Sequence, residues 1–229
     1  MNRLLNITTL ILALSFFKAS ADESSVTVSS GYVSEYLVNG VARSEGSAFV
    51  GVNANKETKY VDIGVNGTLL PDSEFDQSHW GLTLGNNLIE SGDNSLNLTV
   101  GATRHQSGVT GIPNSTEFDA KLTLNNKYIV PYVRGTYDID LEIQGIFGGL
   151  YRVQELPLGA VIVPAIEYGI VDEYDVITAK VTLSRPINMF VPYVEVSWAD
   201  NDFDVANYNF ATTELDGDIV VTAGVSVTF

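Results

Sequence analysis

The chain contains no cysteine and only two histidines among its 229 residues. Without thiols it can form neither a disulfide framework nor a thiolate metal centre. Phosphate-binding loops, nucleotide fingerprints, zinc-ligand spacings and catalytic carboxylate pairs are likewise missing from the sequence. We therefore predict that the protein is not an enzyme, and that it has no cofactor and no metal centre.

Basic residues are also scarce, with 12 Lys and Arg against 28 Asp and Glu, which gives a formal net charge of −16. A charge of this sign repels phosphate backbones and anionic membrane surfaces. The composition therefore argues against nucleic acid as a partner.

Long apolar runs are absent beyond the first 21 residues. Met1-Asn2-Arg3 is a basic start, residues 4–17 are mostly apolar, and Ala19-Ser20-Ala21 is a small-residue cleavage pattern. This order predicts a signal peptide over residues 1–21 that is removed before Asp22, and a single domain over residues 22–229. The longest later apolar run covers residues 158–166, contains a proline and is too short to cross a bilayer as a helix. Only helices and closed barrels satisfy their backbone in lipid, so a membrane protein made from this chain must be a β-barrel.

Alternation of apolar and polar residues is what the sequence does contain, and residues 218–229 show it most clearly. One face of this predicted strand is apolar and ends on Phe229, whereas the other face is small and mostly polar. Bacterial outer-membrane barrels end in such a strand, and their assembly machinery recognises the terminal phenylalanine. A closing edge strand of a secreted sandwich would give the same pattern.

Twelve segments of this kind predict an all-β, antiparallel transmembrane barrel of 12 strands, with ten strands as the alternative. Short turns are predicted at residues 55–58, 125–127 and 185–188, and longer connections at 71–78, 106–116 and 200–217. Short periplasmic turns opposite longer extracellular loops are typical of bacterial barrels. The predicted strands cover residues 25–37, 47–55, 59–69, 79–88, 95–105, 117–125, 128–137, 141–152, 158–170, 175–185, 189–199 and 218–229.

A repeated Val-Pro step, at Pro131, Pro164 and Pro192, sets the register of three strands. If each proline faces lipid, a set of charged residues near the prolines faces the lumen, because a charge on the lipid face near the midplane would cost about 2–4 kcal/mol. The set is either a constriction that selects solutes or a paired network that fills a narrow lumen. Its members are Lys121, Arg134, Glu142, Glu167, Lys180 and Glu195, with Gln144 beside them.

The same register places aromatic residues at the ends of the lipid-facing sides. Aromatic girdles at both membrane interfaces are typical of outer-membrane barrels. The predicted girdle consists of Trp80, Tyr137, Phe190, Trp198 and Phe229.

Residues 30–46 read Ser-Gly-Tyr-Val-Ser-Glu-Tyr-Leu-Val-Asn-Gly-Val-Ala-Arg-Ser-Glu-Gly. This stretch resembles the opening of the TorF-like family of small porins, in which a Ser-Asp-Tyr-like step precedes an aromatic, a basic residue, glycine and a hydrophobic residue. The chain departs from that pattern by carrying Leu37-Val38-Asn39 before Gly40, with its arginine at position 43. The resemblance covers about two strands and implies an outer-membrane barrel with a channel role.

Two further stretches of the sequence resemble known sites. His105 and Ser107 with Glu117 resemble the His-x-Ser plus acidic residue of lipid A 3-O-deacylases, although Gly108 stands where those enzymes carry asparagine. This makes a lipid A-modifying hydrolase the least favoured alternative. Residues 200–204 resemble the first half of a calcium loop, but Val205 and Ala211 occupy the positions that need Gly and Glu, so only loose divalent-cation binding is left open.

Acidic residues are concentrated in the segments assigned to extracellular loops, where they would raise the local cation concentration. We therefore expect an outer-membrane channel for passive diffusion of small solutes, with weak cation preference. Its expected partners are outer-membrane lipids, lipopolysaccharide and the barrel-assembly machinery, the last through Phe229. The alternative is a non-conducting structural or adhesive barrel that presents acidic loops.

Overall fold

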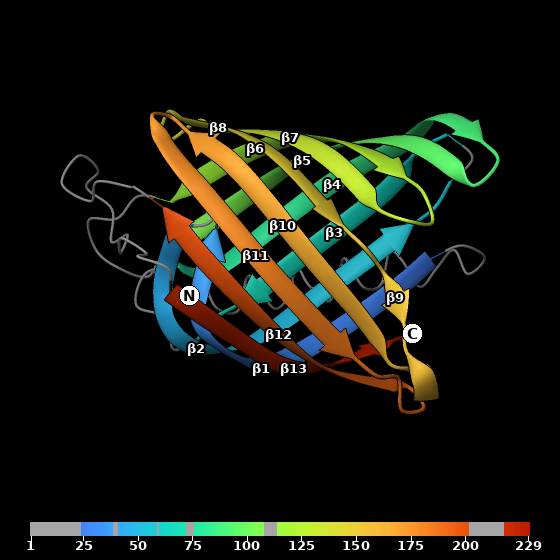
Figure 1. Ribbon diagram of the computed structural model, residues 1–229. Helices are drawn as coiled ribbons and strands as arrows, with labels where there is room; N and C mark the ends of the chain where they lie inside the picture. Colours follow the sequence, from blue (N-terminus) through green and yellow to red (C-terminus); the bar gives the residue numbers. More distant parts are fainter. Residues whose placement is uncertain (1–23, 39–40, 59, 72–75, 108–113, 202–217) are drawn as a thin grey trace.

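The computed structural model describes residues 24–38, 41–58, 60–71, 76–107, 114–201 and 218–229. These residues form a tilted, antiparallel β-barrel, drawn in Figure 1. The predicted signal peptide at 1–21 and the acidic motif beyond Asn201 lie outside the described residues. No helix in the described part of the chain is long and apolar enough to cross a membrane.

The barrel wall follows the order of the chain. Its elements are β1 Ser24–Val38, β2 Val41–Lys56, β3 Asp62–Leu69, β4 Asp76–Ser91, β5 Asn94–Ser107, β6 Ser115–Asn125, β7 Val130–Asp138, β8 Ile143–Tyr151, β9 Gln154–Glu155, the 3-10 turn η1 Pro157–Gly159, β10 Val161–Val171, β11 Tyr174–Ser184, β12 Phe190–Asn201 and β13 Asp218–Thr228.

Twelve strands close the barrel, as predicted. Thirteen strands are labelled, but β8 and the short β9 pair successively with the same strand, β10, so they form one interrupted strand. The ends of the described chain meet, because β1 pairs antiparallel with β13 from Thr27↔Thr228 onward. Backbone hydrogen bonds join Val26 and Phe229 in both directions, at 3.2 and 2.9 Å. This pairing leaves the sheet without a free edge, which is what allows a sheet to stand in lipid.

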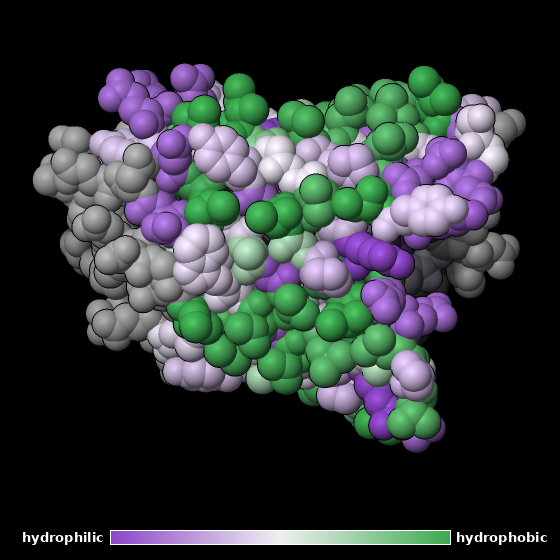
Figure 2. Space-filling view, viewed as in Figure 1, coloured by the Kyte–Doolittle hydropathy of each residue, from purple (hydrophilic) through white to green (hydrophobic). Residues whose placement is uncertain are grey.

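Each strand has an apolar outer face and a different inner face. On β8, Ile146 is 69% exposed whereas its neighbour Phe147 is 1% exposed, because successive side chains point to opposite sides of the wall. Val133 on β7, Ile166 on β10 and Val194 on β12 also point outward and are exposed. Figure 2 shows hydrophobic residues gathered over the middle of the visible wall. An apolar belt on the outside of a closed wall is the arrangement that hydrocarbon stabilises.

The two ends of the barrel differ in their connections. At the turn rim, where Ser24 and Phe229 lie, short turns join β2 to β3, β4 to β5, β6 to β7 and β11 to β12. At the loop rim, the connections β3–β4, β5–β6 and β12–β13 are longer. The other three connections at that rim, β1–β2, β7–β8 and β10–β11, are short. The predicted asymmetry between the two rims therefore holds for half of the loop-rim connections and for the turn-rim connections other than β8–β10.

Three local expectations were wrong. The predicted strands 79–88 and 95–105 leave a gap of six residues, but the connection is a two-residue hairpin, because β4 runs to Ser91 and Gly92 takes the positive φ of 58° that such turns require. Glu142 lies in the β7–β8 turn with φ 58°, not on the lumen-facing side of a strand. Leu158 likewise belongs to η1, with φ 67°, and not to a strand.

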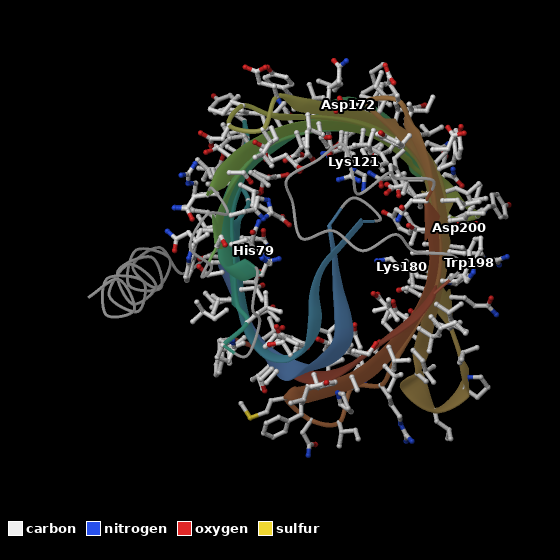
Figure 3. All side chains as sticks on the ribbon, turned by 90° about the vertical axis from the view of Figure 1, so that its left-hand side faces the viewer. His79, Lys121, Asp172, Lys180, Trp198 and Asp200 are labelled. Atoms are coloured by element: carbon white, nitrogen blue, oxygen red, sulfur yellow. The ribbon has the colours of Figure 1, made fainter. Side chains whose placement is uncertain are left out.

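The β1–β2 hairpin departs from the cylinder at the loop rim. In Figure 1 its far end rises across the end of the barrel, and in Figure 3, which looks into that end, the same blue ribbons stand inside the ring of strands. Below it, an apolar cluster faces inward, made of the buried Val33, Leu70 and Val220 with Phe49 packed against them. The loop-rim part of the lumen is therefore narrowed by backbone and apolar side chains.

Candidate functional site: the luminal wall

A group of charged side chains lines the inner face of β6, β7, β10, β11 and β12. We call Lys121, Arg134, Glu167, Lys180 and Glu195 the charge cluster. Lys121 and Arg134 are direct cross-strand partners, and Lys180 pairs in register with Ser197, two residues beyond Glu195. Figure 3 shows Lys121 and Lys180 pointing into the ring, whereas Trp198 points away from it. The cluster thus collects on one side of the lumen.

Glu167 is the acceptor that joins two strands across a third. Arg134 Nη2 donates to Glu167 Oε1 at 3.1 Å, and the Tyr132 hydroxyl donates to Glu167 Oε2 at 2.7 Å. Both donors lie on β7 and the carboxylate on β10, so the bonds pass over β8. Each carboxylate oxygen therefore has its own donor, and the charge-assisted pair is held in one geometry.

Gly149 makes this crossing possible. It is the β8 residue in register with both Tyr132 and Glu167. A Cβ at Gly149 would lie 2.4 Å from Tyr132 Cζ, so any larger residue would displace the ring. The tyrosine therefore lies flat across β8 and its hydroxyl reaches the next strand.

Phe147 forms an apolar platform beneath Arg134. Its ring covers Gly169 of β10, where an added Cβ would be 2.2 Å from Phe147 Cδ1. The guanidinium carbon of Arg134 lies 4.3 Å from the ring centroid. A cation over an aromatic face gains about 0.5–2 kcal/mol, more when it is desolvated. Stacking and the ion pair together fix the orientation of the arginine.

The two lysines are held differently. Lys121 Nζ lies 3.9 Å from the Tyr132 ring centroid, so one tyrosine contacts both a cation and a carboxylate. Lys180 Nζ lies 3.5 Å from Glu195 Oε2, which also accepts a 2.7 Å hydrogen bond from Thr182 Oγ1. The Lys180 side chain points into the barrel and is still 45% exposed. Its ammonium group therefore has solvent-accessible space in the lumen.

The structure brings five of the six predicted luminal residues together and places the sixth elsewhere. Lys121, Arg134, Glu167, Lys180 and Glu195 all lie on the inner wall and contact partners there. Glu142 was also predicted to face the lumen, but it lies in the β7–β8 turn, away from the charge cluster. Gln144 is exposed and lies on the outward side of β8 with Ile146. Sequence reasoning missed Tyr132, Phe147 and the glycines beneath them, although the glycines on β8 and β10 are a readable signal for flat-lying rings.

The predicted girdle residues lie on the outer surface. Tyr137, Phe190, Trp198 and Phe229 are 46, 50, 37 and 71% exposed. Trp80 packs on the outer side of β3, where a Cβ at Gly67 would lie 2.2 Å from its six-membered ring. Trp80, Tyr137 and Trp198 are nearer the loop rim, and Phe190 and Phe229 are nearer the turn rim.

The opposite part of the inner wall, which we call the neutral half, is built from β13, β1, β2 and β3. Cross-strand neighbours there are small or uncharged, as when Gly51 lies next to Ser29 Oγ and Thr68 Oγ1. The inward residues of these strands include Ser29, Gly31, Gly51, Asn53, Gly64, Asn66, Thr68, Thr222, Gly224 and Ser226.

A cavity of about 300 Å³ joins the two parts of the wall near the loop rim. It is lined by Val33, Phe49, Thr68, Leu70, His79, Tyr193, Glu195 and Thr222. His79 faces His105 on the next strand, with ring centroids 5.9 Å apart. In the part of the chain that the structure describes, no group of three or more His, Asp or Glu side chains is placed to hold a metal.

Comparisons with known proteins define the fold. No protein-family model and no curated protein matches the sequence. Among solved structures, the chain is similar to a KdgM porin at 11% identity, covering 89% of this chain and 99% of that one, with a TM-score of 0.56. It also aligns with an anion-selective porin from Comamonas acidovorans (7% identity, 91% and 99% covered, TM-score 0.42) and with OccAB3 from Acinetobacter baumannii (10%, 82% and 57%, 0.45). The chain therefore shares its closed antiparallel barrel fold with the KdgM porin. No family model supports the TorF-like resemblance specifically.

Proposed function

We propose that the protein is an outer-membrane channel for passive diffusion of small hydrophilic solutes. The observation that carries this proposal is the inward-facing Lys180, whose side chain is 45% exposed inside a closed wall. A lumen filled by its own side chains would bury such a residue, as happens in small packed barrels. Ion pairs around an open space would instead steer solutes without closing the path.

We further propose a weak preference for cations. The charge cluster holds three cations and two carboxylates, and the carboxylate of Asp119 acts on Lys121 and Arg134 from the same wall. Because positive and negative charges on this wall are nearly equal in number, we assign the ion selectivity to the charges at the rims. At the loop rim, Asp138, Asp140, Asp172, Glu173 and Asp175 lie at strand ends and turns. A negative mouth raises the local concentration of cations and repels anions.

The apolar outer wall and its aromatic ends support a position in the bacterial outer membrane. In that setting the partners are membrane lipids and lipopolysaccharide, and Phe229, which follows β13, is available to the assembly machinery during insertion. These assignments follow the outward exposure of Phe190, Trp198 and Phe229.

Two measurements on the refolded barrel test the channel. Liposomes that contain it should swell when isotonic sugar or amino-acid solutions are added, whereas protein-free liposomes should not. In planar bilayers under a KCl gradient, the reversal potential should have the sign of potassium permeation. A reversal potential that favours chloride would overturn the cation preference while leaving the channel itself intact.

A specific observation favours a second candidate, a non-conducting barrel. The inward apolar cluster of Val33, Leu70 and Val220 lies beneath the β1–β2 hairpin at the loop rim. If the hairpin closes that end, neither swelling nor current should appear in the intact protein. Shortening the hairpin by deleting residues 37–42 should then produce both.

The hydrolase alternative has its own test. A His105→Ala variant expressed in the bacterium should leave the acyl content of lipopolysaccharide unchanged if the protein is a channel. A change in acyl content would favour the hydrolase.

A further inference from the structure

The chain has only two histidines, and the fold brings them together. His79 on β4 and His105 on β5 are 26 positions apart in the sequence but are direct cross-strand partners. Their rings are tilted by 42°, with centroids 5.9 Å apart. Side chains that are directly opposite on antiparallel strands share one face of the sheet. Here that face is the inner one, because His79 lines the luminal cavity with Tyr193 and Glu195.

From this pairing we propose a luminal binding site for one borderline-soft divalent cation, such as Cu²⁺, Ni²⁺ or Zn²⁺, with His79 and His105 as the two protein ligands. Imidazole nitrogen is the donor that these metals prefer among the side chains this chain contains. Mg²⁺ and Ca²⁺ prefer oxygen ligands and should not compete for the site.

The geometry is close to what a metal requires. With metal–nitrogen distances of about 2.0–2.1 Å and a tetrahedral angle, two coordinating imidazoles have centroids about 5 Å apart. The observed separation of 5.9 Å therefore needs a closure of roughly 1 Å, which side-chain rotation can supply. Both rings are partly exposed, so a hydrated ion reaches them from the lumen.

The remaining coordination positions are open to water. The carboxylate of Glu195 lines the same cavity but is engaged by Lys180 and Thr182. Two protein ligands with water in the other positions make a reversible site of moderate affinity. Such a site would sense or concentrate metal ions at the mouth of the barrel and would not serve as a structural centre.

The test is calorimetric titration of CuCl₂, NiCl₂ and ZnCl₂ into the full-length, untagged barrel refolded in detergent. We expect one bound ion per chain, tightest for Cu²⁺, in line with the general affinity order of these metals. His79→Ala and His105→Ala should each weaken binding by roughly 10²-fold, because each leaves a single donor where two acted together. Thr103→Ala, on the same face of β5, should bind like the wild type.

Calorimetry measures metal binding and needs no ionic current. The test therefore remains valid even if the barrel does not conduct. Wild-type protein that gives no heat of binding with Cu²⁺ would overturn the proposal whatever the variants do. Equal affinity in wild type and in either histidine variant would also overturn it. Because heat-dependent gel mobility reports whether each variant has folded, loss of the barrel is distinguishable from loss of the site.

Discussion

The charged part of the luminal wall and the neutral half line the polar interior with different kinds of side chain. The wall of β6 to β12 carries large charged and aromatic side chains that are paired with one another, as in the Arg134–Glu167 bond at 3.1 Å. Away from the apolar cluster at the loop rim, the neutral half, from β13 to β3, uses glycine and short hydroxyl or amide side chains. One side of the lumen is therefore lined by fixed charges, while the other is lined by short groups that water can solvate.

This difference bears on how the proposed channel would act on solutes. Every charged group in the cluster has a partner that holds it in place, so its field is fixed in direction. Short neutral side chains leave space and exert little field. In the proposed channel, we infer that the charged wall orients solutes and that the neutral half, beyond the apolar cluster at the loop rim, supplies the open cross-section.

The largest effect is expected from Glu167→Ala. The change removes the acceptor of both Arg134 and Tyr132 and leaves a guanidinium facing the lumen without its carboxylate. We expect a loss of about 3 kcal/mol in the free energy of unfolding, at the upper end of the range for a broken charged hydrogen bond. The reversal potential in a KCl gradient should shift toward chloride. If neither urea unfolding nor ion selectivity changes, the charge cluster contributes neither to stability nor to selectivity.

Gly169→Val tests whether the flat-lying phenylalanine supports the charged wall. The new side chain would meet the Phe147 ring, which should cost about 1–3 kcal/mol as overpacking. Gly148→Val is the matched control, because an added Cβ there meets nothing within 4 Å. Thermal unfolding of both variants checks this prediction, and equal midpoints would contradict it.

Lys180→Gln should have a smaller effect on stability. The Lys180–Glu195 pair is 3.5 Å long and its lysine is 45% exposed, so its loss should cost at most about 1 kcal/mol. Removing this cation should strengthen potassium preference. Single-channel recordings in a KCl gradient measure that shift, and a move toward chloride would argue that Lys180 does not face the permeation path.

Asn53→Arg places a charge in the neutral half and should have the smallest effect on folding. Asn53 is exposed on the inner face, so the arginine can remain hydrated and the free energy of unfolding should change by less than about 0.5 kcal/mol. Val133→Arg, on the lipid face of β7, is the contrasting control, expected to cost about 2–4 kcal/mol. If both changes cost the same, the distinction between the inner and outer faces fails.

Much of the fold followed from the sequence because period-two alternation is a local signal. Twelve strands, the closing strand at residues 218–229 and the inward direction of Glu167 and Glu195 could all be predicted from it. The errors lie at strand ends, where Glu142 and Leu158 adopt positive φ that side-chain alternation does not report. Contacts across non-adjacent strands, such as Tyr132 reaching over Gly149 to Glu167, depend on the three-dimensional register and could not be read from spacing alone.

The most direct test of the account uses the absence of cysteine from the chain. A single Asn53→Cys variant in a planar bilayer is treated with a charged, membrane-impermeant thiol reagent while single-channel current is recorded. If the inner wall lines a water-filled conducting lumen, the current should fall in a discrete step on modification, whereas an outward Val133→Cys variant should show no step. A current that is absent, or that responds only to modification of Val133→Cys, would contradict the central claim.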